Sequence, residues 1–238
     1  MYKLINSGYI KIVSVRHYIK QIISSRNKGI DVMAFKTNQE NFWAGEFGDE
    51  YIDRNLIEEI APARRFMFSK ILSRTNGVGS VIEFGANIGS NLLAIHSLLP
   101  KAELHALEIN ERAVKALNSY DWLSSVKQGS FLEDTFEDIA DLSFTCGVLI
   151  HINPDHLKTA YKALYDASRK YVMVFEYYNP APVAIPYRGH EDRLFKRDFA
   201  GEMMDIYPDL KLVDYGFIYH RDTNFPTDDM TWFLMEKT

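Results

Sequence analysis

The feature that most constrains the fold is an apolar segment, a glycine-containing turn and an apolar helical segment in direct succession. Residues 80–84 predict a short buried strand, and residues 90–99 predict a helix that ends before Pro100. The turn between them reads Gly85-Ala86-Asn87-Ile88-Gly89. Glycine permits positive φ and close approach to a ligand, and the first N–H groups of a helix can bind ligand oxygens. This succession is typical of the first unit of a doubly wound sheet, although such a turn can also bind nothing.

Further apolar segments predict the rest of the sheet. They cover residues 103–109, 125–128, 142–146, 171–177, 210–218 and 230–235. Helical patterns lie between several of them, including one over residues 111–117. Strands that alternate with helices predict an α/β protein with a doubly wound, Rossmann-like sheet.

Composition excludes several classes of protein. The 238 residues are 47% hydrophobic and 25% charged, which is typical of a globular chain. Cys146 is the single cysteine, so neither an internal disulfide nor a cysteine-based zinc site is expected, and we assign no metal. No apolar run approaches the roughly 20 residues of a membrane span. A cytoplasmic protein is therefore expected.

Charge is distributed unevenly along the chain. Residues 1–31 carry six basic residues and one acidic residue, a net charge of +5. Because the whole chain has a net charge of −5, the remaining residues have a net charge of −10. An acidic body argues against nonspecific binding to nucleic acid. The oligomeric state stays open.

The basic segment 1–32 has a helical spacing of apolar residues between positions 12 and 23. It can be a helix packed on the domain or on a partner, or a peripheral membrane element. We favour a third interpretation, in which the segment is dispensable and Met33 is an alternative start. Residues 33–75 are then expected to form a helical lid, and residues 76–238 the core.

The turn after the first strand differs from the dinucleotide pattern G-x-G-x-x-G, because two of its three glycines are missing. Its spacing, Glu83-x-Gly85-x-Asn87-x-Gly89, instead resembles motif I of the class I S-adenosylmethionine-dependent methyltransferases, with Asn87 at the middle glycine. This resemblance implies S-adenosyl-L-methionine (SAM) as cofactor. It also implies a seven-stranded sheet that ends in an antiparallel hairpin.

The same resemblance assigns further residues to the cofactor. Glu108 ends the second strand, 23 residues after Gly85, where its carboxylate can accept both ribose hydroxyls; Ile109 follows it. Ser130 would contact the adenine amino group, and Phe131 or Leu132 would contact the ring, although Phe131 fits a core position equally well.

The segment after the fourth strand contains Gly147 and His151. Ligands of a doubly wound sheet bind outside the carboxyl ends of its strands, so this segment is expected to line the methyl-donor pocket. His151 could take a proton from a nucleophile, or it could be a structural histidine.

The aromatic segment 41–55 lies just before the core, where it could close over the methyl donor. Aromatic faces at Phe47 and Tyr51 could stabilise a sulfonium, and Arg54 could pair with the donor carboxylate. For Trp43 we expect packing on the sheet.

The segment 176–199 is rich in aromatic, proline and basic residues, and its residues 178–190 are expected to form a loop over the crevice after the fifth strand. Together with residues 41–55 it resembles the pseudaminic acid biosynthesis-associated methylase family. The resemblance implies an acidic sugar or nucleotide sugar of nonulosonic acid type as acceptor, in surface polysaccharide or flagellin glycan biosynthesis. Candidate acceptor residues are Tyr177, Tyr178, Asn179, Tyr187, Arg188 and His190. Arg188, Arg193, Lys196 and Arg197 could hold a carboxylate or phosphate, although for Arg193 a solvated charge is the better interpretation.

The chemistry has three open alternatives. The methyl group can go to oxygen or nitrogen of the acceptor. A methyltransferase that acts on an unrelated small molecule fits the same motifs. An NAD-dependent oxidoreductase or epimerase of sugar nucleotides, or a scaffold without activity, would use a similar fold.

Overall fold

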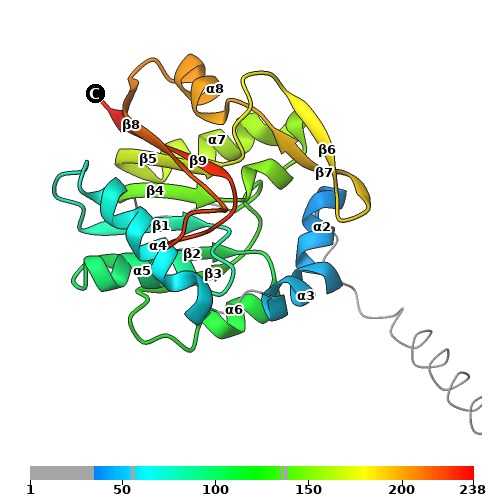
Figure 1. Cartoon of the computed structure of the whole chain (residues 1–238), viewed down its shortest axis with the longest axis horizontal. Coiled ribbons are helices and arrows are strands. Elements are labelled where there is room, and N and C mark those ends of the chain that lie inside the picture. Colours follow the sequence, from blue (N-terminus) through cyan, green and yellow to red (C-terminus); the bar gives the residue numbers. More distant parts are fainter. Residues whose placement is uncertain (1–34, 55–56, 135, 137–138) are drawn as a thin grey trace, which may run out of the picture. The chain divides into compact units, whose positions relative to one another are not determined.

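The computed structural model describes residues 35–238 except 55, 56, 135, 137 and 138 (Figure 1). The predictions for residues 1–32 lie outside the described residues. In the described part of the chain, no helix has both the length and the apolar character that crossing a membrane requires.

Seven strands form one sheet in the order β3-β2-β1-β4-β5-β9-β8. Their bounds are β1 Ser80–Phe84, β2 Glu103–Glu108, β3 Ser125–Gln128, β4 Ala140–Cys146, β5 Ser168–Glu176, β8 Leu210–Ile218 and β9 Met230–Lys237. Strands β1 to β5 pair in parallel, whereas β9 runs antiparallel to both β5 and β8. This confirms the predicted α/β sheet with its C-terminal antiparallel pair.

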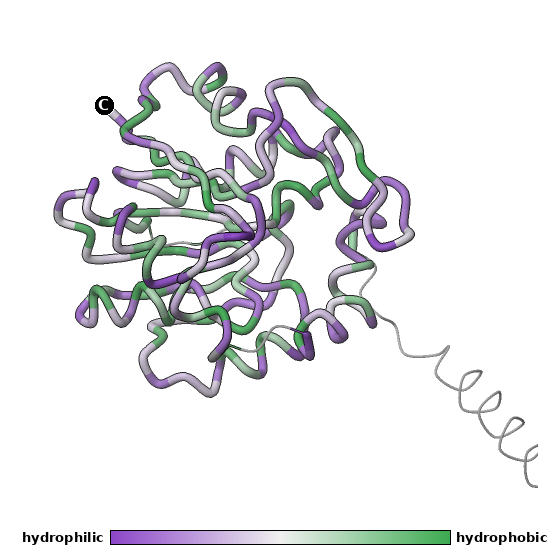
Figure 2. The backbone as a smooth tube through the Cα atoms, viewed as in Figure 1, coloured by the Kyte–Doolittle hydropathy of each residue, from purple (hydrophilic) through white to green (hydrophobic). Residues whose placement is uncertain are grey.

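Helices cover both faces of this sheet (Figure 1). Their bounds are α2 Asn38–Ala44, α3 Glu46–Arg54, α4 Ile57–Leu72, α5 Ser90–Leu98, α6 Glu111–Leu117, α7 Leu157–Asp166 and α8 Phe199–Ile206. Successive side chains of a strand point to opposite faces. Accordingly, Val81 packs in the cluster with α4 and α5, and Ile82 packs in the cluster with α7 and α8. Figure 2 shows the hydrophobic residues that run through the central strands.

The expected lid over residues 33–75 divides into two parts. Helix α4 packs beside α5, and its residues Met67, Phe68 and Ile71 belong to the core. Helices α2 and α3 instead lie apart from the face of the sheet, beside two further strands, β6 (Val183–Tyr187) and β7 (His190–Lys196) (Figure 1). Helix α2 begins with a capping box, in which the Thr37 side chain and the Glu40 side chain bond reciprocally to the backbone.

The structure corrects the expectation that the segment after β5 is a loop. Strand β6 (Val183–Tyr187) pairs antiparallel with β7 (His190–Lys196). Arg188 has φ 50° and Gly189 has φ 83°, so both residues of the two-residue turn are left-handed. Such a turn matches the twist of a hairpin. The prolines in this segment concealed the hairpin from sequence analysis.

Candidate functional site

A cavity lies at the carboxyl ends of β1, β2 and β4, with α2 and α3 forming part of its wall. It encloses about 1220 Å³ of empty space, part of it open to solvent. Eight of the predicted site residues line it, namely Tyr51, Gly85, Asn87, Glu108, Ile109, Phe131, Gly147 and His151. This is the position in which ligands of doubly wound sheets bind.

The turn after β1 needs three left-handed residues. The φ angles are 76° at Gly85, 48° at Asn87 and 85° at Gly89. A Cβ atom at Gly85 would lie 2.5 Å from Cγ2 of Val148. Asparagine adopts this backbone region more readily than most residues, which explains why it can stand where the motif has glycine. Gly89 itself precedes α5 and does not line the cavity.

Glu108 is buried at the end of β2. Its Oε2 accepts the N–H of Asn87 at 2.7 Å, and its Oε1 accepts the N–H of Asn110 at 2.8 Å. Burial raises the pKa of Glu108, while backbone hydrogen bonds from Asn110, Asn87 and Ile109 lower it. A carboxylate has about four acceptor positions and can share them. Its oxygens can therefore still accept ligand hydroxyls.

One end of the cavity contains several buried polar atoms without a partner among the described residues. They are Nε of Arg64, Oδ1 of Asn87, Oδ1 of Asn91 and, behind them, Oε2 of Glu83. Oε1 of Glu83 accepts Nδ2 of Asn91 at 2.6 Å. Buried polar groups normally have partners. This end can therefore receive a ligand that carries both an ammonium and a carboxylate.

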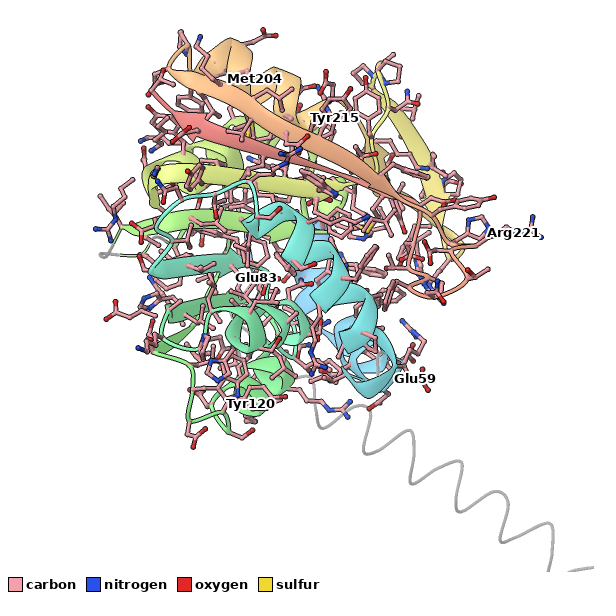
Figure 3. The ribbon with its side chains drawn as sticks, turned by 60° about the vertical axis from the view of Figure 1, so that its left-hand side comes forward. Glu59, Glu83, Tyr120, Met204, Tyr215 and Arg221 are labelled. Atoms are coloured by element: carbon pink, nitrogen blue, oxygen red, sulfur yellow. The ribbon has the colours of Figure 1, made fainter. Side chains whose placement is uncertain are left out.

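Glu83 does not line the cavity directly, although it was predicted to bind the cofactor. It lies in the interior on β1, as Figure 3 shows. Burial raises its pKa to about 8. Glu83 instead accepts a hydrogen bond from Asn91, and the Asn91 side chain lines the cavity.

Arg64 is a residue that sequence analysis missed. It lies on α4 and lines the cavity, with Nη1 3.5 Å from Sγ of Cys146 and its guanidinium 5.6 Å from the centre of the Phe175 ring. Arg54, which we expected to bind a carboxylate, does not line the cavity and pairs instead with Glu50 at 3.4 Å. Both arginines lie in predicted helical segments with mixed charge, so only the fold distinguishes them.

Ser130 is also placed differently from the prediction. Its hydroxyl is buried and donates to Oε1 of Glu40 on α2, and it accepts the N–H of Leu132 at 2.9 Å. These contacts connect α2 to the segment after β3. Phe131 lines the cavity and stacks on Phe84 with ring centroids 4.6 Å apart, so it serves the core and the cavity wall together.

His151 ends a 3-10 turn (Leu149–His151) that follows β4 and faces the cavity. Its Nδ1 lies within hydrogen-bond distance of the Arg193 carbonyl. A carbonyl can only accept, so Nδ1 carries the proton and Nε2 keeps a lone pair. Burial lowers the pKa of His151 to about 4. The ring is therefore neutral near pH 7 and can accept a proton.

Glu176 holds the turn that carries His151. Its carboxylate lies at the end of β5 and accepts the N–H groups of Val148 and Leu149, each at 3.0 Å. Burial raises the pKa of Glu176 to about 8, against these hydrogen bonds. Sequence analysis assigned Glu176 no role, because its hydrogen-bond partners lie in the turn after β4, far from it in the sequence.

Aromatic rings surround His151. The Trp43 ring lies 4.6 Å and the Tyr187 ring 5.0 Å from the His151 ring, and Tyr51 lies 5.2 Å from Trp43. Trp43 thus lines the cavity instead of packing on the sheet, and its Nε1 is buried without a partner among the described residues. The four residues come from α2, α3, the turn after β4 and β6.

The structure brings only part of the predicted acceptor residues to this point. Tyr187 contacts His151, and His190 contacts Phe42 and Phe47. None of the six predicted acceptor residues lines the cavity itself. Tyr178 is 42% exposed beside Phe233, Asn179 donates to the Ala181 carbonyl, Arg188 is exposed in the hairpin turn, and the half-buried Tyr177 lies under Lys196.

Comparison with known proteins supports the fold. No protein-family model and no curated protein matches the sequence. The chain is similar to the plantazolicin methyltransferase in complex with SAH, at 12% sequence identity over 84% of this chain and 94% of that chain, with TM-score 0.57. It is similar to magnesium protoporphyrin IX methyltransferase from Synechocystis PCC 6803 with bound SAM, at 10% identity over 87% and 100%, with TM-score 0.59.

A glycopeptide N-methyltransferase complexed with SAM is a third similar structure, at 12% identity over 73% of this chain and 87% of that chain, with TM-score 0.55. The chain has the methyltransferase fold. By their names, these neighbours act on plantazolicin, on magnesium protoporphyrin IX and on a glycopeptide, so the fold alone selects no acceptor. Among the described residues, no group of three or more His, Cys, Asp or Glu side chains could hold a metal ion.

Proposed function

We propose that the protein is a SAM-dependent methyltransferase whose cofactor occupies the cavity beside β1, β2 and β4. The observation that carries this proposal is the pairing of Glu108 with the turn over Gly85–Gly89, because it leaves acceptor positions for a ribose diol. Phe131 and Ile109 would flank the adenine and ribose. Arg64, Asn87 and Asn91 would bind the carboxylate and ammonium of the methionine part.

The cofactor supplies an electrophilic methyl group on a sulfonium. Residues of this chain would exclude water from the reacting atoms and hold the acceptor in line with the methyl group. Trp43 and Tyr51 are the aromatic faces placed to stabilise the sulfonium charge. With an alcohol acceptor, the methyl group would pass from the cofactor sulfur to the acceptor oxygen, and Nε2 of His151 would take the hydroxyl proton. An amine acceptor needs less help from this base.

The acceptor that we propose is an acidic sugar or nucleotide sugar of nonulosonic acid type, in surface glycan biosynthesis. Support comes from the rings of Tyr187 and Trp43, which can stack on a sugar face beside His151. The family resemblance of residues 176–199 supports the same class of acceptor.

A methyl-transfer assay tests the proposal. The protein is incubated with methyl-labelled SAM and a panel of nonulosonic acids, their nucleotide-activated forms and precursor amino sugars. Mass spectrometry then detects a gain of one methyl group. We expect the gain in an acidic sugar and its loss in His151→Asn if the acceptor is an alcohol. If only an unrelated small molecule is methylated, the proposed acceptor class is wrong, but the proposed methyltransferase activity is supported.

A further inference from the structure

A second cavity adjoins the first on the side of the β6–β7 hairpin. It lies between the segment before α2, the residues that follow the His151 turn, and β7. It has about 920 Å³ of empty space, part of it open to solvent. Thr37 and Gln39 line both cavities. The two cavities are therefore neighbours with a shared wall.

Basic side chains line this second cavity. Lys36 and Arg193 both face it, with His156 nearby in the wall, whereas Asp192 is the acidic residue of the lining. Among the residues that the structure describes, neither Lys36 nor Arg193 has a carboxylate within the 4.0 Å of an ion pair. The cavity thus has cations whose charge no described acidic side chain pairs with directly.

Arg193 is held more firmly than a surface arginine. Its guanidinium lies 5.2 Å from the centre of the Phe42 ring, and Nη1 donates to the Asp192 carbonyl at 3.1 Å. Its Nε is buried and has no partner among the described residues. A buried guanidinium N–H normally has an acceptor. The guanidinium is exposed at Nη1, while its Nε–H is a donor that a ligand oxygen can satisfy.

The same residue connects the second cavity to the first. The Arg193 carbonyl holds Nδ1 of His151, while its guanidinium belongs to the second cavity. The side chain of Gln39 donates to the Asp192 carbonyl at 3.1 Å and so joins α2 to β7 at the shared wall. A ligand that reaches from His151 past Gln39 would place its far end between Lys36 and Arg193.

We propose that the second cavity binds an oxyanion of the acceptor, either a carboxylate or a phosphate, through Arg193 and Lys36. This inference rests on the proposed function, because it assumes that the acceptor lies beside His151. It assigns the anion to these two residues and not to Arg188, which lies in the exposed hairpin turn and lines neither cavity. Guanidinium and ammonium groups are the usual partners of such anions.

Calorimetric titration of the full chain, loaded with S-adenosylhomocysteine, tests the proposal with two probes. Inorganic phosphate represents a phosphate source, and N-acetylneuraminic acid represents a sugar carboxylate. The methyl ester of that sugar removes only the negative charge. We expect at least one anionic probe to bind. Binding of phosphate alone or of the sugar acid alone identifies the source of the anion. Where the sugar acid binds, its methyl ester should bind about tenfold or more weakly.

Two variants and one matched control decide the assignment. Arg193→Gln keeps the backbone carbonyl that holds His151, and Lys36→Gln removes the second cation. Each should weaken the bound probe about tenfold or more, since a charge-assisted hydrogen bond is lost. Lys158→Gln removes a neighbouring exposed cation on α7 that lines neither cavity, and it should leave the affinity unchanged.

Affinity for S-adenosylhomocysteine separates this inference from the proposed function. It should be equal in the wild-type chain and in all three variants. If the nucleoside fails to bind the wild-type chain, the proposed function is wrong, and the phosphate titration of the unloaded chain still tests the anion site. If neither probe binds, or if both cation variants bind as tightly as the wild-type chain, the anion site is refuted.

Discussion

The side chain of Glu108 and the backbone N–H of Asn87 form a hydrogen bond of 2.7 Å, which ties the end of β2 to the turn after β1. The strands are parallel neighbours in register, with Phe84 opposite Leu107. The bond therefore joins the two segments that form adjacent walls of the cavity. It also orients the carboxylate, because Asn110 holds the other oxygen at 2.8 Å.

Replacing this carboxylate should weaken the binding of S-adenosylhomocysteine. Glu108→Ala removes the acceptor for two ribose hydroxyls, and a hydrogen bond to a charged group is worth about 1.5–3 kcal/mol. We expect a loss of at least tenfold by calorimetry. Glu103→Ala, at the exposed start of the same strand, is the matched control. An affinity within twofold of the wild-type chain in Glu108→Ala would exclude the ribose assignment.

The glycine turn should be intolerant of a side chain at Gly85. In Gly85→Val, Cβ would lie 2.5 Å from Cγ2 of Val148, and a β-branched residue would have to adopt φ 76°. We expect binding of the nucleoside to be lost, with a lowered melting temperature. In Gly79→Ala the nearest heavy atom is 3.5 Å away, so this variant should bind normally. Normal binding by Gly85→Val would contradict the placement of the ligand at this turn.

Arg64 and Arg54 distinguish the structural assignment from the sequence-based one. Arg64→Ala removes the guanidinium that faces the cavity, and we expect a roughly ten- to hundredfold loss of affinity for S-adenosylhomocysteine. Arg65→Ala, at an exposed position beside it, controls for the loss of charge on α4. A large effect in Arg54→Ala, with none in Arg64→Ala, would restore the assignment made from the sequence.

The low pKa of His151 has a consequence for stability. Its pKa is about 4 in the folded chain and 6.5 in the reference state, so between these values the unfolded chain binds more protons. This contribution to the free energy of unfolding is complete above pH 6.5 and is lost as the pH falls towards 4. The shift corresponds to about 3 kcal/mol at most.

Denaturant unfolding at several pH values measures this contribution. Burial raises the pKa values of Glu83 and Glu176 to about 8. Their contribution to the free energy of unfolding therefore falls as the pH rises, which is opposite to the effect of His151. The comparison of the wild-type chain with His151→Asn removes their effect, because both chains contain them. The stability difference between the two chains should shrink from pH 7 to pH 4. A difference that does not change with pH would show that His151 is not buried in its neutral form.

Sequence patterns predicted the sheet closely, because most of its strands are rich in apolar residues and lie between polar or glycine-containing segments. The strands Ser80–Phe84, Ser125–Gln128 and Leu210–Ile218 lie at the predicted residues. The cavity-lining positions of Gly85 and Glu108 follow from the same regularity, since parallel strands end at one edge.

Other residues of the site could not be found in this way. Arg64 and Arg193 resemble many surface arginines in the sequence, and only the packing of α4 and β7 brings them to the cavities. The hairpin that contains Tyr187 was concealed by prolines, which normally indicate a loop. Tertiary contacts, and not local pattern, determine these positions.

Calorimetric titration of the wild-type chain with S-adenosylhomocysteine and, separately, with NAD tests the central claim most directly. We predict saturable binding of the nucleoside with one site per chain and no binding of NAD, because the turn has Asn87 and Ser90 where the dinucleotide pattern needs glycine. Binding of NAD without binding of S-adenosylhomocysteine would contradict the account.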